Sequence, residues 1–250
     1  MLPGKVPALC LPSISRDTRA AILIFSQKAC KSSSSQAWLN RHVSDHFVKM
    51  SKYDGYRARS AYKLIEIDDK FRILKPGLKA LDCGAAPGSW TQVLVERIVN
   101  SDPKACGKVV AVDKLGFSPV DGAKILAQCD FTLPETKRKI LEAFDVNVSN
   151  SKIDLVLSDM APNTTSDSDT NHRRIVTLVY NCLKFAVEIL DEKSTSSSFL
   201  CKLWDGSETK NLIKDLKLLF AKVDTIKPDS SRDESSELFV LARNFLGLRK

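Results

Sequence analysis

The run Asp82-Cys-Gly-Ala-Ala-Pro-Gly-Ser-Trp90 joins an apolar stretch, residues 79–83, to a helical pattern over residues 90–99. Gly84 and Gly88 lack a Cβ, so the backbone can approach a ligand closely at both positions. Backbone amides at the start of the helix provide hydrogen-bond donors. The run therefore predicts a strand, a ligand-binding turn and a helix, in that order.

The spacing of these glycines restricts the ligand. Gly84 and Gly88 are separated by three residues that include Pro87, unlike the G-x-G-x-x-G pattern of dinucleotide-binding folds. An NAD-dependent oxidoreductase shares the fold class but would require that pattern. The run also lacks the Lys-Ser/Thr pair of a P-loop. It suits a nucleoside cofactor without a pyrophosphate, such as S-adenosylmethionine (SAM).

Strand-like runs alternate with helix-like runs along the rest of the chain. The further strand-like runs are residues 109–113, 125–129, 153–157, 199–203, 223–226 and 238–242, and the further helical patterns cover 59–74, 134–144, 175–190 and 212–220. This alternation predicts a mostly parallel sheet with helices on both faces. The last two runs are joined by the polar residues 227–236, so we expect an antiparallel hairpin. The prediction is one α/β domain over residues 45–250, a seven-stranded Rossmann-like SAM-dependent methyltransferase fold.

Two acidic residues follow strand-like runs and extend the predicted nucleoside site. Asp113 ends the run 109–113, where a carboxylate can accept hydrogen bonds from both ribose hydroxyls. Asp130 follows the run 125–129, where its side chain can meet the adenine edge. The glycine turn and the two acids together predict a nucleoside-binding edge of the sheet.

The net charge of +8 is unevenly distributed. Residues 1–44 contain six basic side chains and one acidic side chain and are rich in serine, which predicts a mitochondrial transit peptide. The alternative for this segment is an N-terminal extension without a targeting role. Residues 49–79 contain nine basic and four acidic side chains, whereas the chain from Ala80 onward is nearly neutral. We therefore expect residues 45–78 to be a basic segment that approaches RNA.

Two further classes of protein are not expected. The longest apolar run, Ala20 to Phe25, is far shorter than the roughly 20 residues that span a bilayer. The seven cysteines form no C-x-x-C pair and show no zinc-ligand spacing, so no metal site is expected. Their odd number and dispersed positions fit a reducing compartment.

Four motifs occur together and in order in this chain. They are Tyr56-Arg-Ala-Arg-Ser-Ala-Tyr-Lys-Leu64, Gly84-Ala-Ala-Pro-Gly-Ser-Trp90, Ser158-Asp-Met-Ala-Pro-Asn163, and Lys227-Pro-Asp-Ser-Ser-Arg232 with Ser236-Glu237. With them, residues 45–245 resemble the FtsJ/RrmJ family of SAM-dependent RNA ribose 2′-O-methyltransferases. The N-terminal segment points to the mitochondrial branch of this family. That branch implies a uridine of large-subunit ribosomal RNA as substrate, a location in the mitochondrial matrix, and a role in assembling the large ribosomal subunit.

The resemblance also implies the site residues. The family's catalytic Lys-Asp-Lys-Glu set falls on Lys63, Asp159, Lys202 and Glu237. The implied cofactor-binding residues are Gly84, Ala85, Ala86, Pro87, Gly88, Ser89, Trp90, Asp113, Asp130 and Asp159. Ser89 replaces the second glycine of many members, and a hydroxyl at a helix start is compatible with an N-cap.

The chemistry of the implied site can be argued from the residue types. Methyl transfer from a sulfonium to a hydroxyl requires in-line positioning and the removal of one proton. A lysine in water titrates at about pH 10.4, and a neighbouring cation in a partly dry cleft lowers the pKa of such an amine. Lys202 with Lys63 beside it is expected to form that pair, with Lys202 as general base. The alternative for Lys202 is an ordinary surface lysine at a strand end.

Cations and aromatic residues are interleaved before the first strand-like run. The candidate RNA-binding residues are Lys49, Lys52, Tyr56, Arg57 and Arg59, with Tyr53 and Tyr62 among them, and Arg232 in the polar stretch near the C-terminus. Cations suit phosphate contacts, and aromatic rings suit base stacking. The alternative is a solvated helix face without a binding role.

Two functions compete with RNA methylation. A non-catalytic ribosome-assembly factor could use the same scaffold, although the complete catalytic set favours an enzyme. A small-molecule or protein methyltransferase would need neither that set nor the basic segment. Ribosomal RNA within the large-subunit precursor is the expected partner, and a monomer is the expected state. The sequence does not identify the modified nucleotide, the cleavage point of the N-terminal segment, or whether naked RNA is the substrate.

Overall fold

The strands of the sheet follow the apolar runs of the sequence. The computed structural model describes residues 45–102, 104–145, 153–232 and 234–248. The predicted transit peptide, residues 1–44, therefore lies outside the described residues and stays a prediction. His46–Lys250 form one compact unit. Among the described residues, no helix has the length and apolar content that crossing a bilayer requires.

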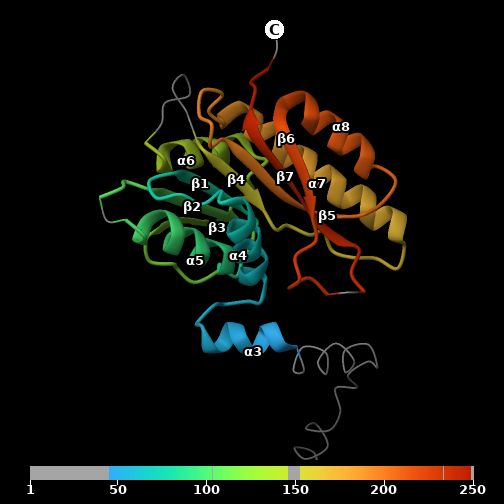
Figure 1. The fold of residues 1–250 in the computed structure, drawn as a ribbon, viewed down its shortest axis with the longest axis horizontal. Coiled ribbons are helices and arrows are strands. Elements are labelled where there is room, and N and C mark those ends of the chain that lie inside the picture. Colours follow the sequence, from blue (N-terminus) through green and yellow to red (C-terminus); the bar gives the residue numbers. More distant parts are fainter. Residues whose placement is uncertain (1–44, 103, 146–152, 233, 249–250) are drawn as a thin grey trace, which may run out of the picture. The chain divides into compact units, whose positions relative to one another are not determined.

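Seven strands form one sheet in the order β3-β2-β1-β4-β5-β7-β6 (Figure 1). Their bounds are β1 Lys79–Cys83, β2 Lys108–Asp113, β3 Ala123–Ala127, β4 Leu155–Ser158, β5 Ser198–Trp204, β6 Phe220–Ile226 and β7 Glu237–Phe245. The first five are parallel to their neighbours, whereas β7 runs antiparallel to both β5 and β6. This confirms the predicted α/β fold and its C-terminal antiparallel hairpin.

Helices cover both faces of the sheet. They are α3 His46–Tyr53, α4 Ser60–Phe71, α5 Ser89–Leu94, the π-helix η1 Val95–Asn100, α6 Pro134–Ala143, α7 Ser168–Ile189 and α8 Thr209–Leu219. One core holds apolar residues of α6, α7 and α8, and the other holds those of α4, α5 and η1. Side chains alternate between the two faces of a strand. On β5, accordingly, Phe199 and Cys201 enter the first core and Leu200 enters the second.

Three elements differ from their predicted bounds. Strand β3 ends at Ala127, two residues early, because Gln128 adopts a left-handed backbone with φ +56°. Helix α7 starts seven residues before its apolar stripe, where the Asp167 carboxylate caps it by accepting the Thr170 N–H at 2.9 Å. Helix α3 was not predicted, because its eight residues bury only Val48 and Ser51 and so carry little apolar periodicity.

Candidate active site

The glycine turn after β1 has the backbone that glycine permits. Gly84 has φ +75° and Gly88 has φ +104°, values that other residues rarely adopt. A Cβ on Gly84 would lie 2.1 Å from Met160 Cγ, and one on Gly88 would lie 2.7 Å from Arg57 Nη1. The N–H groups of Gly84 and Ala85 both donate to the Val112 carbonyl, at 2.9 and 3.2 Å. The turn is therefore tied to β2, with its backbone open to close approach.

A cavity of about 890 Å³ lies along the carboxyl edge of β1, β2 and β4. Four of the implied cofactor residues line it, namely Gly84, Ala86, Asp113 and Asp159. Its other lining residues include Leu115, Phe131, Met160, Pro162, Arg173 and Arg174. A mostly apolar wall with a few acidic groups at strand ends is typical of a nucleoside site.

The two strand-end acids are placed differently. Asp113 borders the cavity, and its two oxygens accept the N–H groups of Ala86 at 2.9 Å and Leu115 at 2.7 Å. Each oxygen keeps a further lone pair for a ligand hydroxyl. Asp130 accepts the Thr132 N–H at 2.9 Å and pairs with Lys114 Nζ at 2.9 Å. Burial opposes ionisation of Asp130, but these contacts outweigh it and hold the pKa of Asp130 below its usual value.

The remaining implied cofactor residues shape the turn from within. Ala85, Ser89 and Trp90 are buried. The Trp90 indole N–H donates to the Ser60 carbonyl at 2.8 Å, and the hydroxyls of Ser89 and Ser60 lie 2.8 Å apart. The N-cap of α5 is Gly88, so Ser89 binds α4 and is not the capping residue that the sequence suggested.

The four implied catalytic residues form two ion pairs. Lys63 Nζ lies 2.6 Å from Glu237 Oε1, and Lys202 Nζ lies 3.0 Å from Asp159 Oδ1. Lys202 Nζ also donates to the Asp159 carbonyl at 2.6 Å. All four side chains are between 10% and 17% exposed, so the pairs are largely shielded from water. Residues up to 174 positions apart in sequence are thus joined in one site.

The alternation of the strands explains this gathering. Lys202 lies on the same face of β5 as Leu200, which packs in the core that contains α4. Lys63 lies on α4, and its ammonium is 5.7 Å from the centroid of the Phe239 ring on β7. Glu237 precedes Phe239 by two residues and so shares its face of β7. The side chains from α4, β5 and β7 therefore meet over one face of the sheet.

Glu237 is held in its charged form. Burial opposes this, but the neighbouring Lys63 and Lys202 ammonium groups outweigh burial and keep the pKa of Glu237 below its usual value. The Ser231 hydroxyl supports the same state by donating to Glu237 Oε1 at 2.8 Å. Because both lysines act on one carboxylate, the two ion pairs belong to a single electrostatic site.

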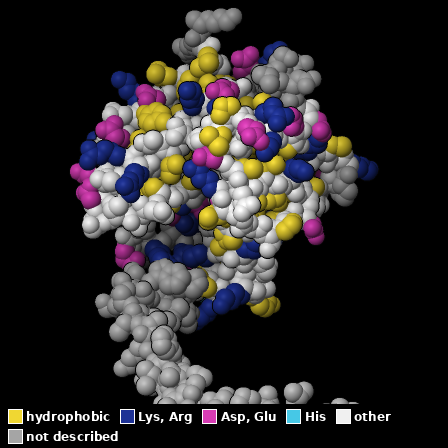
Figure 2. All heavy atoms as spheres, turned by 180° about the vertical axis from the view of Figure 1, so that it is seen from behind, with side chains coloured by type: hydrophobic (Ala, Val, Ile, Leu, Met, Phe, Trp, Pro, Cys, Tyr) yellow, Lys and Arg dark blue, Asp and Glu magenta, His cyan; other side chains and the backbone are white. Residues whose placement is uncertain are grey.

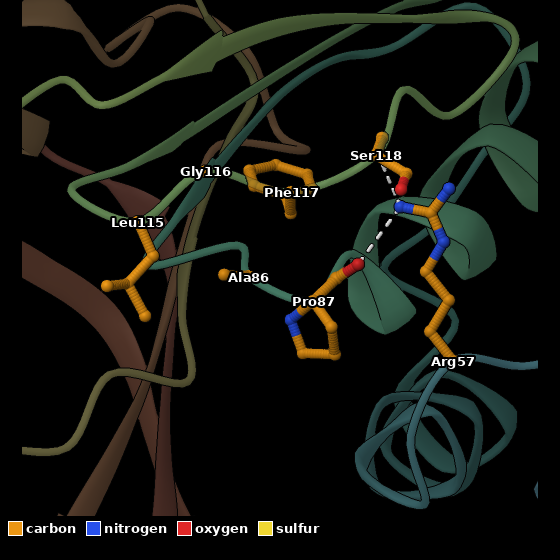
Figure 3. Close-up of a pocket in the computed structure, with 7 residues that line it drawn as sticks. All are labelled: Arg57, Ala86, Pro87, Leu115, Gly116, Phe117 and Ser118. Carbon is orange, nitrogen blue, oxygen red and sulfur yellow. Dashed lines mark hydrogen bonds between the residues drawn. The ribbon is translucent and has the colours of Figure 1, made fainter. Parts of the chain in front are cut away.

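The Arg57 side chain is bound within the protein. Its guanidinium donates to the carbonyls of Pro87 at 2.9 Å, Ser118 at 2.6 Å and Pro119 at 2.5 Å. Figure 3 shows this side chain reaching across a cavity of about 620 Å³ toward Pro87 and Ser118. Arg57 therefore ties the glycine turn to the loop after β2, which leaves little of its guanidinium for RNA.

Two more of the candidate RNA contacts are engaged internally. The Tyr56 hydroxyl donates to Glu96 at 2.7 Å, and burial together with this carboxylate raises the pKa of Tyr56 well above its usual value. The Arg59 guanidinium donates to the Ser230 carbonyl and lies 5.5 Å from the centroid of the Phe47 ring. Arg232 is half-buried in the loop between β6 and β7.

Helix α3 carries the exposed members of the basic segment. Lys49 and Lys52 are exposed, and the Tyr53 side chain is 92% exposed. Over the rest of the visible face, Figure 2 shows basic and acidic side chains intermixed, in agreement with the nearly neutral composition from Ala80 onward. We name Lys49, Lys52 and Tyr53 the α3 surface.

Several site residues were not predicted. Arg173 and Arg174 line the cavity from α7, and Met160 closes against Gly84. The two consecutive arginines shortly after the Ser158–Asn163 motif were the signal available for the α7 wall. Asp82 was the other signal, because it is a charged residue inside an apolar strand.

Comparison with known proteins agrees with this geometry. Residues 56–245 match the family model described as FtsJ-like methyltransferase. The chain is 41% identical to "rRNA methyltransferase 2, mitochondrial" of Drosophila melanogaster, over 87% of this chain and 85% of that protein. It is 43% identical to "Ribosomal RNA large subunit methyltransferase E" of Paramagnetospirillum magneticum, over 86% and 84% respectively. A crystal structure of a ribosomal RNA methyltransferase from Plasmodium falciparum matches with a TM-score of 0.66 and 30% identity, covering 77% of this chain and all of that one.

Proposed function

This chain belongs to the FtsJ-like methyltransferase family, and we propose from its site that it transfers a methyl group from SAM to a ribose 2′-hydroxyl of ribosomal RNA. The observation that carries the proposal is the arrangement of Lys63, Glu237, Lys202 and Asp159 as two shielded ion pairs. Asp159 also lines the large cavity, so the lysines and the predicted cofactor site share a boundary.

The residues around the cavity fit SAM. Gly84 leaves a place where any Cβ would collide with Met160, so the backbone is accessible to a closely packed ligand. Asp113 offers carboxylate oxygens for ribose hydroxyls, and Phe131 with Pro162 offers apolar surface for a base. When bound, SAM supplies a methyl group on a positively charged sulfur.

Lys202 is proposed as the base that removes the 2′-hydroxyl proton. A neutral amine has two hydrogens and one lone pair. Its hydrogens can be directed to the Asp159 carbonyl and Oδ1, at 2.6 and 3.0 Å, which leaves the lone pair for the substrate hydroxyl. Lys63 and Glu237 hold the neighbouring charge and orient the hydroxyl. The largely shielded position of the pairs strengthens these interactions relative to bulk water.

The names of the relatives support a specific substrate and place. Those from fly and worm are mitochondrial rRNA methyltransferases. We propose that this enzyme modifies a uridine of mitochondrial large-subunit ribosomal RNA in the matrix and contributes to assembly of that subunit. A non-catalytic assembly factor on the same scaffold is the second candidate, and the intact pairing of all four catalytic residues disfavours it.

Mapping of 2′-O-methylation in mitochondrial and cytosolic ribosomal RNA tests the substrate. After loss of the protein, one ribose in the mitochondrial large-subunit RNA is expected to lose its methyl group, while the cytosolic map stays unchanged. Re-expression of the wild-type chain is expected to restore the mark. An unchanged mitochondrial map would refute the substrate assignment.

The α3 surface is proposed to contact RNA phosphates and a base. Replacing Lys49 and Lys52 together by alanine should weaken RNA binding at low salt. It should also reduce the slope of log affinity against log salt by about 1.4, since each phosphate contact to single-stranded RNA contributes about 0.7. Tyr53→Ala should weaken binding roughly tenfold at every salt concentration, because stacking is worth about 1–3 kcal/mol per base. Fluorescence anisotropy with a ribosomal RNA fragment measures both effects.

Lys217→Ala is the matched control for these lysine variants. Lys217 is exposed on α8, an element that packs against β6 and β7 and lies outside the basic segment. Its replacement should leave both affinity and salt slope unchanged. Equal effects of the α3 and α8 variants would show that RNA binding depends on overall charge and not on the α3 surface.

A further inference from the structure

Asp82 is a buried carboxyl group that the proposed mechanism does not use. It lies on β1, two residues before Gly84, and its exposed fraction is 0%. Its Oδ2 accepts the Thr91 hydroxyl at 2.7 Å, whereas Oδ1 has no hydrogen-bond partner among the described residues. A buried carboxylate with an unsatisfied oxygen is costly unless it binds a proton or faces a positive charge. Asp82 therefore has the surroundings of a proton-binding group.

The charged neighbours of Asp82 lie toward the cavity. Asp113, on the adjacent β2, and Asp159, after the adjacent β4, both line the cavity, and both add negative potential at Asp82. The Cys83 thiol is the next group on β1, and burial with its Cys182 contact keeps the Cys83 pKa well above neutrality. Burial, followed by Asp159 and Asp113 and opposed by Thr91, raises the pKa of Asp82 to about 7. Only a positive charge placed in the cavity would reverse this balance.

The proposed cofactor and its product differ in that charge. SAM has a positively charged sulfonium, whereas S-adenosylhomocysteine has a neutral thioether at the same position. An acidic environment discriminates between two such ligands by Coulomb attraction. The cavity already contains the negative groups that would sense the difference.

We propose that Asp82 is a cofactor-discriminating residue: it holds a proton when the cavity is empty or contains the neutral product, and loses it when SAM binds. This inference rests on the proposed function. On binding of SAM the proton passes from Asp82 to solvent, and the resulting carboxylate stabilises the sulfonium. After methyl transfer the sulfur is neutral, Asp82 takes up a proton from solvent, and the product is held less tightly than SAM.

Isothermal titration calorimetry of the full chain tests this exchange. Titrations of SAM and of S-adenosylhomocysteine in two buffers with different ionisation enthalpies give the number of protons released. At about pH 7, where half of the Asp82 side chains carry a proton, SAM should release roughly half a proton per molecule and the product none. The pKa of Asp82 is lower in the SAM complex than in the empty protein, so SAM affinity should rise with pH. We expect a roughly tenfold rise between about pH 6 and pH 8, with no change for the product.

Asp82→Asn provides the variant arm. Asparagine keeps an oxygen that accepts the Thr91 hydroxyl but cannot exchange a proton. Proton release on SAM binding should disappear, and the preference for SAM over the product should fall roughly tenfold at about pH 8. Asp121→Asn, which changes an exposed carboxylate before β3, should behave as the wild type.

Each other outcome has a definite meaning. If wild-type protein binds both ligands with no difference in proton release or pH dependence, the role of Asp82 is refuted. If Asp82→Asn weakens both ligands equally or fails to fold, and the wild type shows no proton release, Asp82 is a structural residue only. If SAM does not bind the wild type at all, the proposed function fails together with this inference.

Discussion

Replacing Lys202 by alanine is expected to abolish methyl transfer while SAM binding survives. The only ammonium paired with Asp159 is removed among the described contacts, and with it the proposed acceptor of the 2′-hydroxyl proton. General-base catalysis contributes about 10²–10⁴-fold, so turnover should fall by roughly 10³-fold or more. The cofactor cavity is lined by other residues, so the affinity for SAM should change little. Single-turnover assays with radiolabelled SAM and calorimetry measure the two quantities.

Lys222→Ala is the matched control for this prediction. Lys222 lies in the same sheet on β6 and is exposed, so its removal tests the general effect of losing one lysine charge. It should turn over substrate at the wild-type rate. Lys202→Ala with wild-type turnover would disprove the role of Lys202 as base, and equal loss of activity and of SAM binding would assign it to cofactor binding.

The part of the fold set by local pattern was predictable. The apolar runs located all seven strands, and the polar stretch between the last two predicted their antiparallel pairing. Boundaries were less predictable, because they depend on single backbone conformations. Gln128 ends β3 by adopting a left-handed φ, and no periodic pattern indicates such a residue.

The candidate site was predictable where motif order substitutes for distance. Lys63 and Glu237 are far apart in sequence, and only the resemblance to a family placed them in one set before the structure brought them to 2.6 Å. Features that depend on a particular partner were not predictable. Arg57 has the composition of an RNA contact, but three backbone carbonyls occupy its guanidinium. Asp82 is distinctive because one of its oxygens lacks a partner, which is a property of the packed structure alone.

The glycine turn gives the second large effect, through Gly84→Ala. A Cβ at this position would lie 2.1 Å from Met160 Cγ, and φ is +75°. A left-handed backbone costs an alanine about 1–2 kcal/mol, and displacing a packed side chain costs about 1–3 kcal/mol more. A total of roughly 3 kcal/mol should lower Tm by about 6–12 °C in a domain of this size. Thermal unfolding followed by circular dichroism measures the loss.

Cofactor binding should suffer beyond this loss of stability. Met160 and Gly84 both line the cavity, so the displaced Met160 side chain must move into space that SAM would occupy. We expect at least a tenfold loss of SAM affinity at a temperature where the variant is fully folded, which corresponds to about 1.4 kcal/mol. Gly116→Ala is the matched control, because a Cβ at Gly116 would meet nothing within 4 Å. If Gly84→Ala lost stability but bound SAM normally, the turn would be a structural element only, and the cofactor would have to bind elsewhere along the sheet edge.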